Sequence, residues 1–257
     1  MNVVVCIKQT FDTEAKIVLN SKGQIDGNGV HLIVNPYDEY AIEEGIRLKE
    51  KFGGQVTAIT MRSSGGQEAL RTALAMGADK AILISDPRIE DADEWVTAQV
   101  LSKAISAIPY DIIITGRTAI DDGSSQVAVR VAENLHIPSV TSILKVEVNG
   151  KMTTVTREID GGTEQVEIAL PAVFTAQKGL NEPRYPSLMG LMKAKKKELK
   201  IVNLTDLGFT NEDLTTKMKV EEYTVSEARQ AGRKLQGDPA QAVRELVKLL
   251  NDEVRAF

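Results

Sequence analysis

The sequence predicts an α/β fold: a doubly wound parallel sheet with an antiparallel extension and a C-terminal arm. Three observations lead to this fold class. Buried-strand and helix patterns alternate four times between residues 3 and 135, which is typical of a parallel sheet covered by helices on both faces. Short strands of alternating polarity then run from 139 to 176. Beyond 200 the apolar pattern is too weak for a separate core, so we expect an α/β domain over 1–200 and an arm over 201–257 that lies along another chain.

The first half of the chain shows four strand and helix pairs. An apolar run over 3–7 predicts a strand buried on both faces, and a long polar connection over 8–30 follows it. The next helix begins at Asn35-Pro36, where Asn35 can supply the cap oxygen and Pro36 fits the first turn. The later elements are strands over 55–60, 81–85 and 111–115, and helices over 65–76, 93–108 and 125–135. Trp95 is expected on the inward face of its helix.

Between 139 and 176 the pattern changes to hairpins. Asn149-Gly150 is a strong two-residue turn signal, and a second turn at Asp160-Gly161-Gly162 separates two alternating runs. Pro171 then opens a short apolar run that predicts a buried strand. We expect these strands to extend the same sheet in antiparallel fashion. A final helix follows Asp238-Pro239 and runs from 240 to about 254.

The composition indicates one substantial core and excludes several classes of function. The chain has 257 residues, of which 42% are hydrophobic and 26% are charged, so it can bury one core. A net charge of -5 argues against a nucleic-acid binder, which needs a basic excess to neutralise phosphates. One cysteine, Cys6, and two histidines, His31 and His136, allow neither an internal disulfide nor a His/Cys metal site. We therefore expect no metal and a reducing compartment.

The sequence shows no signal for export or for membrane insertion. No charged and apolar leader precedes the first strand, and no apolar run approaches the roughly 20 residues that cross a bilayer. We therefore expect a cytoplasmic protein that does not insert into a membrane.

Three loops lie where a doubly wound sheet binds its ligands, beyond the carboxyl ends of the strands. They are 6–9, 61–65 and 116–125. In the third loop, Gly116 and Gly123 permit close backbone approach, while two serines and a helix N-terminus offer donors for a phosphate. An ordinary strand-to-helix connection explains the same turn residues equally well. The pair Asp121-Asp122 would repel a phosphate unless its side chains point away or cap the helix.

No catalytic constellation is present in the sequence. There is no Gly-x-x-x-x-Gly-Lys phosphate loop, no complete Gly-x-Gly-x-x-Gly after a strand, and no histidine near a plausible nucleophile. Cys6 could be a reactive thiol, but at the end of a buried strand a cysteine is more often an inert small hydrophobe. We therefore assign no catalytic residue.

The stretch 178–197 is long for a loop in a compact domain, and such loops tend to be functional. Pro183 and Pro186 interrupt it, large apolar residues follow, and a cluster of cations comes next: Lys193, Lys195, Lys196 and Lys197. Apolar residues beside cations favour docking onto an acidic partner. In an arbitrary protein the alternative, a scaffold with Leu188 in its own core and solvated lysines, is the commoner arrangement.

Four short motifs, in order, give the chain a family resemblance. They are REIDGG at 157–162, LPAV at 170–173, LNEPRY at 180–185 and MKAKKK at 192–197. With Asn35-Pro36-Tyr37 and the 116–126 stretch, these motifs resemble the beta subunit of electron transfer flavoprotein over residues 1 to about 208. The resemblance implies an adenine-nucleotide-hydrolase-like α/β fold and an electron-carrier subunit rather than an enzyme.

The resemblance also implies a structural AMP in this chain, with the redox FAD mainly on the alpha subunit at a shared interface. The matching AMP positions are Cys6, Asn35, Pro36, Tyr37, Asp38, Met61, Gly116, Arg117, Thr118, Ala119, Ile120, Asp121, Asp122, Gly123, Ser124, Ser125, Gln126 and Val127. A bifurcating branch of the family places a second FAD in the AMP site, uses NADH as donor and has Asp-Gly-Asp-Thr-Ala-Gln-Val in this loop. This chain has Asp-Asp-Gly-Ser-Ser-Gln-Val instead, which resembles the AMP-binding branch. A free-standing adenine-nucleotide sensor of similar fold is a further alternative.

Partner proteins follow from the same resemblance. An alpha subunit completes a heterodimer, flavoprotein dehydrogenases such as the acyl-CoA dehydrogenases of fatty acid beta-oxidation donate electrons, and a quinone-linked oxidoreductase accepts them. In the family, 178–197 is a recognition loop whose leucine, at Leu188, inserts into a pocket of the dehydrogenase, and Glu158 matches a residue that contacts an arginine of the mobile flavin domain. The expected partner-binding residues are Glu158, Tyr185, Leu188, Met189, Met192, Lys193 and Lys196.

Overall fold

The computed structural model describes residues 1–225 and 231–254. The chain divides into two compact units: Met1–Lys16 with Gly27–Glu221, and Ile17–Asp26 with the described part of Glu222–Phe257. The boundary expected at 200 falls inside strand β11 (Leu199–Val202), which pairs in parallel with β5. The α/β unit therefore extends to Glu221 rather than to 200.

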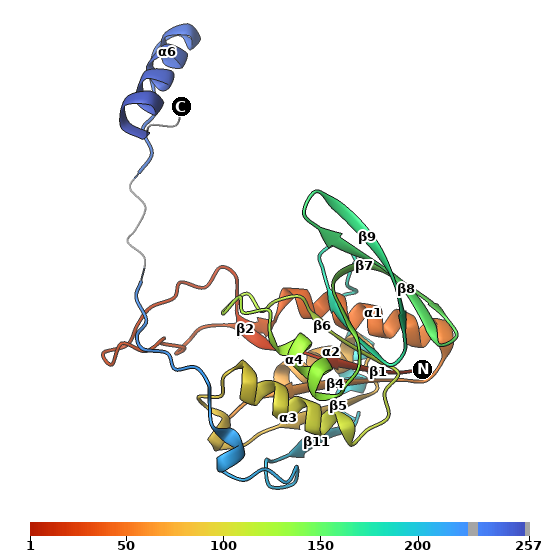
Figure 1. Ribbon diagram of the computed structural model, residues 1–257. Coiled ribbons are helices and arrows are strands. Elements are labelled where there is room, and N and C mark those ends of the chain that lie inside the picture. Colours follow the sequence, from red (N-terminus) through yellow and green to blue (C-terminus); the bar gives the residue numbers. More distant parts are fainter. Residues whose placement is uncertain (226–230, 255–257) are drawn as a thin grey trace. The chain divides into compact units, whose positions relative to one another are not determined.

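The first unit is built on a nine-stranded sheet with the order β11-β5-β4-β1-β6-β10-β7-β8-β9. Every neighbouring pair from β11 to β7 is parallel, and β7, β8 and β9 continue as an antiparallel meander. The strands are β1 (Asn2–Cys6), β4 (Gln55–Met61), β5 (Lys80–Ile84), β6 (Ile112–Gly116), β7 (Ser139–Asn149), β8 (Met152–Ile159), β9 (Gly162–Ala169) and β10 (Ala172–Ala176). Figure 1 shows the meander as the green strands at one edge of the sheet.

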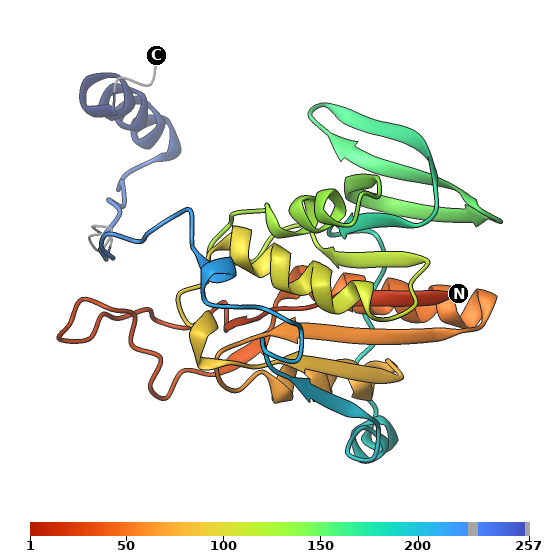
Figure 2. The ribbon, with the colours of Figure 1, turned by 60° about the horizontal axis from the view of Figure 1, so that its bottom comes forward.

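Helices cover both faces of this sheet, because parallel strands bury two apolar faces. α1 (Pro36–Phe52) and α2 (Gln67–Met76) pack on the face that includes Val3 and Val5 of β1. α3 (Glu94–Ser106) and α4 (Val127–Asn134) pack on the other face, with Val4. Figure 2 shows α3, in yellow, across the sheet from α1, in orange. The doubly wound parallel architecture predicted from the sequence is confirmed.

Two strands differ from the sequence prediction. β10 does not belong to the antiparallel extension: it lies between β6 and β7 and is parallel to both. All five of its residues are buried, as in the other central strands of a parallel sheet, whereas β9 at the edge is mostly exposed. The connection over 8–30 is also not wholly irregular, because β2 (Gln9–Phe11) pairs antiparallel with β3 (Leu32–Val34).

Trp95, expected in the core, is 38% exposed. It stands in the first turn of α3, and the cationic groups of Arg130 and Lys217 lie over its ring, 5.8 and 6.0 Å from the centroid. A carboxylate oxygen of Asp93, the cap of α3, accepts from the backbone N–H of Met218 at 3.0 Å. The ring therefore contacts cations at the surface instead of filling the core.

Two helices shape the C-terminal third of the chain. α5 (Leu188–Ala194) lies within the predicted loop, and the hydroxyl of its cap Ser187 accepts from the N–H of Gly190 at 3.0 Å. The final helix spans the predicted range but changes type: α6 (Pro239–Leu249) is followed directly by a π turn over Leu250–Val254. Asp238 caps α6, as expected from the sequence.

The second unit buries little of its own apolar surface. Leu19 and Ile25 form an isolated bridge in its first segment. In α6, Val243, Leu246 and Val247 share one helical face, and each is more than 40% exposed. None of the helices in 1–225 and 231–254 has the length and apolar character needed to cross a membrane.

Candidate functional site

Three of the predicted residues end neighbouring strands at the carboxyl edge of the sheet. Cys6 ends β1, Met61 ends β4 and Gly116 ends β6, and β1 lies between the other two strands. The helices that follow β1 and β4 cover one face, whereas the helix that follows β6 covers the other, so the winding reverses between β1 and β6. In doubly wound sheets ligands bind at this switch point.

Asp38, in the first turn of α1, connects the chain after β1 with the end of β6. Its two carboxylate oxygens accept backbone N–H bonds from Lys8 at 2.6 Å and from Gly116 at 2.9 Å. Residue 116 has to be glycine, because a Cβ there would collide with a carboxylate oxygen of Asp38 and with Tyr37. Burial raises the pKa of Asp38 to about 7, although the two N–H donors oppose that shift.

Asn35 does not cap α1, in contrast to the sequence prediction. Its side chain makes no capping bond. Its amide nitrogen donates to the carbonyl of Thr118 at 2.9 Å, and its amide oxygen accepts from the N–H of Ile120 at 3.2 Å. Asn35 itself is 1% exposed, and these two bonds satisfy its buried amide while they tie the loop after β6 to the start of α1. The start of α1 and the β6–α4 loop (residues 117–126) therefore form one assembly.

Lys8 lies in the selected loop 6–9 but was not among the predicted binding residues, and it pairs with the two acidic residues of the β6–α4 loop. Its ammonium group lies 2.8 Å from Asp121 and 2.6 Å from Asp122. Burial alone would lower the pKa of Lys8, but the hydrogen bonds to both carboxylates raise it. Burial likewise would raise the pKa of Asp122, and the bond from Lys8 lowers it, so the ions stay charged. A lysine directly after a buried strand, at the ligand edge of the sheet, is the signal that could have identified Lys8.

The end of the β6–α4 loop offers backbone donors. Ser125 has a positive φ of 55°. Asp122 accepts from the N–H of Ser124 at 2.9 Å, so it closes a turn and does not cap the helix. The bond from Arg130 to the carbonyl of Gln126 opens the hydrogen-bond ladder of α4. The N–H groups before it have no partner within the helix, and together with a neighbouring ammonium group they are chemically suited to a phosphate.

Cys6 is buried at the end of β1. Burial, with a smaller effect of the Asp38 carboxylate, raises the pKa of its thiol to about 12. The thiol therefore stays protonated at physiological pH, which supports the inert alternative. In residues 1–225 and 231–254 no three histidine, cysteine, aspartate or glutamate side chains gather as metal ligands would.

A second group of predicted residues lies on and just before α5. Tyr185 is 95% exposed, Leu188 83%, Met192 73% and Met189 66%. Lys193 and Lys196 are exposed on the same segment. This placement contradicts the scaffold alternative, in which Leu188 packs in the core of its own chain.

Lys197 is not part of the solvated cation cluster that the sequence suggested. Its ammonium group donates to the carbonyls of Leu74 and Ala78, at 2.9 and 2.5 Å, at the end of α2. Burial lowers the pKa of this lysine. Lys197 therefore anchors the segment, while Lys193, Lys195 and Lys196 remain exposed.

Glu158 belongs to neither group of elements: it lies on a strand of the antiparallel meander. It is an exposed residue of β8 opposite Thr163 of β9. One of its carboxylate oxygens accepts a hydrogen bond from the side-chain amide of Gln177, which follows β10. Glu158 is thus exposed, as predicted, but a second side chain restricts its orientation.

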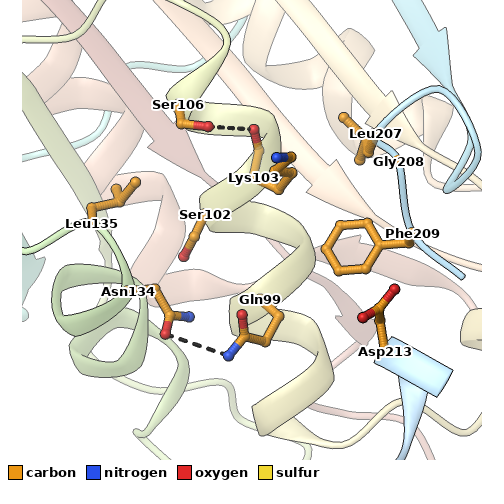
Figure 3. Close-up of a pocket in the computed structure, with 10 residues that line it drawn as sticks. All are labelled: Gln99, Ser102, Lys103, Ser106, Asn134, Leu135, Leu207, Gly208, Phe209 and Asp213. Atoms are coloured by element: carbon orange, nitrogen blue, oxygen red, sulfur yellow. Dashed lines mark hydrogen bonds between the residues drawn. The ribbon is translucent and has the colours of Figure 1, made fainter.

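A hollow of about 340 Å³ lies between α3, the end of α4 and the segment around Phe209 (Figure 3). The amides of Gln99 and Asn134 are 3.5 Å apart across it, and Asp213 already accepts two bonds from Thr210. None of the residues predicted to bind a nucleotide or a partner lines this hollow. The candidate site is therefore defined by the strand ends and their loops, not by the volume of a cavity.

The fold and the loop geometry define a doubly wound α/β protein with a candidate ligand site at the switch point of its sheet. The electron transfer flavoprotein domain model matches residues 22–207. The chain is 48% identical over 258 residues to electron transfer flavoprotein subunit beta of Bacillus subtilis, with all of both chains covered. It is 39% identical to subunit beta of Mus musculus and 38% identical to that of Homo sapiens, over 92% of this chain and 93% of each relative. The chain belongs to the electron transfer flavoprotein family, among its beta subunits.

Proposed function

We propose that this chain is the beta subunit of a heterodimeric electron transfer flavoprotein and acts as an electron-carrier component, not as an enzyme by itself. It binds a structural AMP, shares the FAD interface with an alpha subunit, and docks flavoprotein dehydrogenases such as acyl-CoA dehydrogenases. A quinone-linked oxidoreductase then accepts the electrons. Membership of the beta subunits supports the heterodimer. FAD, when bound, supplies the redox chemistry, and the residues of this chain bind and orient.

The assembly at the strand ends carries the AMP proposal. Asn35 and Asp38 hold the end of β6 and its loop against α1, and Lys8 compensates part of the charge of the acidic pair. Without that compensation, two adjacent carboxylates would repel a phosphate. Lys8 and the first N–H groups of α4 would hold the phosphate of the AMP. The Asp-Asp-Gly-Ser-Ser order of the loop favours AMP over a second FAD.

The exposed apolar residues of the recognition loop (178–197) support the docking proposal. Leu188, Met189 and Met192 are three of the seven residues of helix α5, and all three are mostly exposed. An apolar group that is solvated in the free protein gains free energy when a partner buries it, and Lys193 and Lys196 beside it would attract an acidic surface. We propose that a pocket of the dehydrogenase covers Leu188.

Leu188→Ala tests this docking role in the purified heterodimer. An apolar anchor at the centre of an interface contributes about 2 kcal/mol to binding. The affinity of the heterodimer for the dehydrogenase, measured by flavin reduction, should therefore fall more than tenfold. The melting temperature, the AMP content and chemical reduction by dithionite should stay unchanged, because Leu188 leaves no cavity in the fold. Ile201→Ala, which truncates an exposed residue of β11, is the matched control.

Normal electron transfer in Leu188→Ala would exclude the docking role.

A bifurcating flavoprotein with a second FAD, and a free-standing adenine-nucleotide sensor, remain the two competing functions. The sensor would require no partner, whereas the exposed apolar faces of α5 and α6 are surfaces that other proteins commonly cover. We place the proposed heterodimer in the cytoplasm, since its thiol Cys6 is free and buried and requires no oxidising compartment.

A further inference from the structure

The recognition loop is attached to α1 by one arginine just before α5. The guanidinium group of Arg184 lies 2.8 Å from Glu43 and 2.7 Å from Glu50. Each carboxylate accepts a second bond from it, at 3.2 and 3.1 Å respectively, so both pairs are bidentate. The side chain of Glu43 is 2% exposed, and a carboxylate buried to that degree requires cationic partners. Arg47 of α1 also donates to Glu43, at 2.6 Å, so Arg184 is one of two such partners.

Neighbouring hydrogen bonds attach the same end of the loop to the same helix. The amide nitrogen of Asn181 donates to a carboxylate oxygen of Glu44 and to the carbonyl of Tyr40, both at 3.0 Å. Arg47 of α1 donates to the carbonyl of Glu182 at 3.3 Å. α1 has seventeen residues; its first turn belongs to the candidate nucleotide site, and its later turns carry these contacts, so one helix supports both.

The other end of α5 is attached to α2. Arg71 donates to the carbonyls of Ala194 and Lys197, at 2.5 and 3.2 Å. Ala194 is 2% exposed, and a Cβ at Gly190 would collide with the carbonyl of Ala75, so the two helices approach closely. α5 is therefore fixed against α2, and the chain just before it is fixed against α1, while the apolar residues of α5 remain exposed.

Leu188, the exposed first residue of α5, lies four positions after Arg184, with three residues between them. A binding anchor contributes more to affinity when little conformational freedom is lost on docking. From these contacts we infer that Arg184 is a positioning residue: through Glu43 and Glu50 it fixes Leu188 in the place where a dehydrogenase meets it. This inference rests on the proposed docking function. In this role Arg184 acts through Leu188 and not by a contact of its own.

A purely structural role for Arg184 predicts something different. If Arg184 only helps to neutralise the buried Glu43, its loss lowers the stability of the fold. Any effect on the affinity for the dehydrogenase is then independent of Leu188. If it acts by placing Leu188, the two residues belong to one unit, and their effects on docking are not additive. The coupling between the two substitutions therefore separates positioning from stabilisation.

The experiment is a double-mutant cycle in the heterodimer, with Arg184→Gln, Leu188→Ala and the double variant. The dehydrogenase concentration for half-maximal flavin reduction should rise about fivefold to tenfold in Arg184→Gln at an unchanged maximal rate. The double variant should be no weaker than Leu188→Ala alone. Arg184→Lys should recover part of the loss, because lysine keeps the charge but not the bidentate fork. Lys145→Gln, which breaks an exposed pair with Glu147, is the control.

Glu50→Gln provides a second route if Arg184→Gln does not fold. It removes the more exposed of the two pairs, leaves Glu43 paired, and should raise the same concentration by about threefold. Unchanged docking in the folded Arg184 variant, or effects of Arg184→Gln and Leu188→Ala that multiply, would overturn the positioning role. Unchanged docking in Leu188→Ala alone would instead overturn the proposed function, so the two failures can be told apart.

Discussion

The ammonium group of Lys8 lies 2.8 Å from a carboxylate oxygen of Asp121, 113 residues further along the chain. The contact joins the end of β1 to the loop after β6, and these strands are neighbours in the sheet. The backbone N–H of Lys8 donates to Asp38 as well. One residue thus connects the start of α1 with the β6–α4 loop.

Lys8→Met should weaken AMP binding to the heterodimer by about tenfold, since the acidic pair then faces the phosphate uncompensated. The melting temperature should change little, because an ion pair this exposed contributes about 0–1 kcal/mol. Titration calorimetry with AMP measures the affinity. Lys103→Met removes an exposed lysine of α3 and serves as the control. Equal affinities in the Lys8 and Lys103 variants would contradict the role of Lys8.

Asp38 should give the fold a pH-dependent stability term. Burial raises its folded pKa to about 7, whereas an unfolded aspartate has a pKa of about 3.9. The folded state binds the proton more tightly, so the stabilisation is present at low pH. It is lost at roughly 1.4 kcal/mol per pH unit as the pH rises between the two pKa values.

Asp38→Asn lacks this term. The unfolding free energy of the native protein minus that of Asp38→Asn should therefore fall as the pH rises from about 4.5 to about 7. Urea unfolding across that range measures it. A difference that stays constant with pH would mean that Asp38 titrates at the same pKa in both states.

Cys6 should be inert towards thiol reagents in the folded protein. Its pKa of about 12 leaves a negligible fraction of thiolate at pH 8, and its side chain is buried. A chromogenic disulfide reagent should react slowly with the native chain and release about one equivalent in denaturant, since the chain has one cysteine. Rapid reaction of the native protein would show that the strand end opens or that the thiol is activated.

Glu158→Ala should change the distribution of flavin-domain orientations in the heterodimer. Glu158 lies in β8, outside the nucleotide assembly, and Gln177 restricts its carboxylate, which can therefore offer a fixed charge to an arginine. AMP content should not change. Small-angle scattering and electron-transfer rates measure the effect, with Glu147→Ala in β7 as the control. If both readouts match the native protein, Glu158 is a solvated surface charge.

The sequence predicted the elements well where the signals are local. Buried runs, helix stops and the Asn149-Gly150 turn are short-range features, so most of the sheet and its helices follow from them. The direction of β10 could not be predicted, because its pairing with β6 depends on residues sixty positions away. The same limit applies to Lys8, which pairs across 113 residues, and to Asn35, whose cap-like position suggested a local bond.

The recognition loop shows a different limit. Nothing in the sequence separates one lysine of this loop from another. In the structure, however, the ammonium group of Lys197 bonds to α2, while Lys193 and Lys196 are exposed. Lys197 differs from the other two because folding brings carbonyl groups at the end of α2 close to its ammonium group. The exposure of Leu188 was likewise undecided in the sequence, because an apolar residue in a loop can be either anchor or core.

The cofactor content of the heterodimer, co-purified with its alpha subunit, tests the proposed function most directly. Acid extraction followed by chromatography gives the amounts of flavin and adenine nucleotide per heterodimer. We predict one FAD and one AMP. Two FAD without AMP would contradict this account in favour of the bifurcating flavoprotein, and AMP bound to this chain with no alpha subunit and no flavin would contradict it in favour of the sensor.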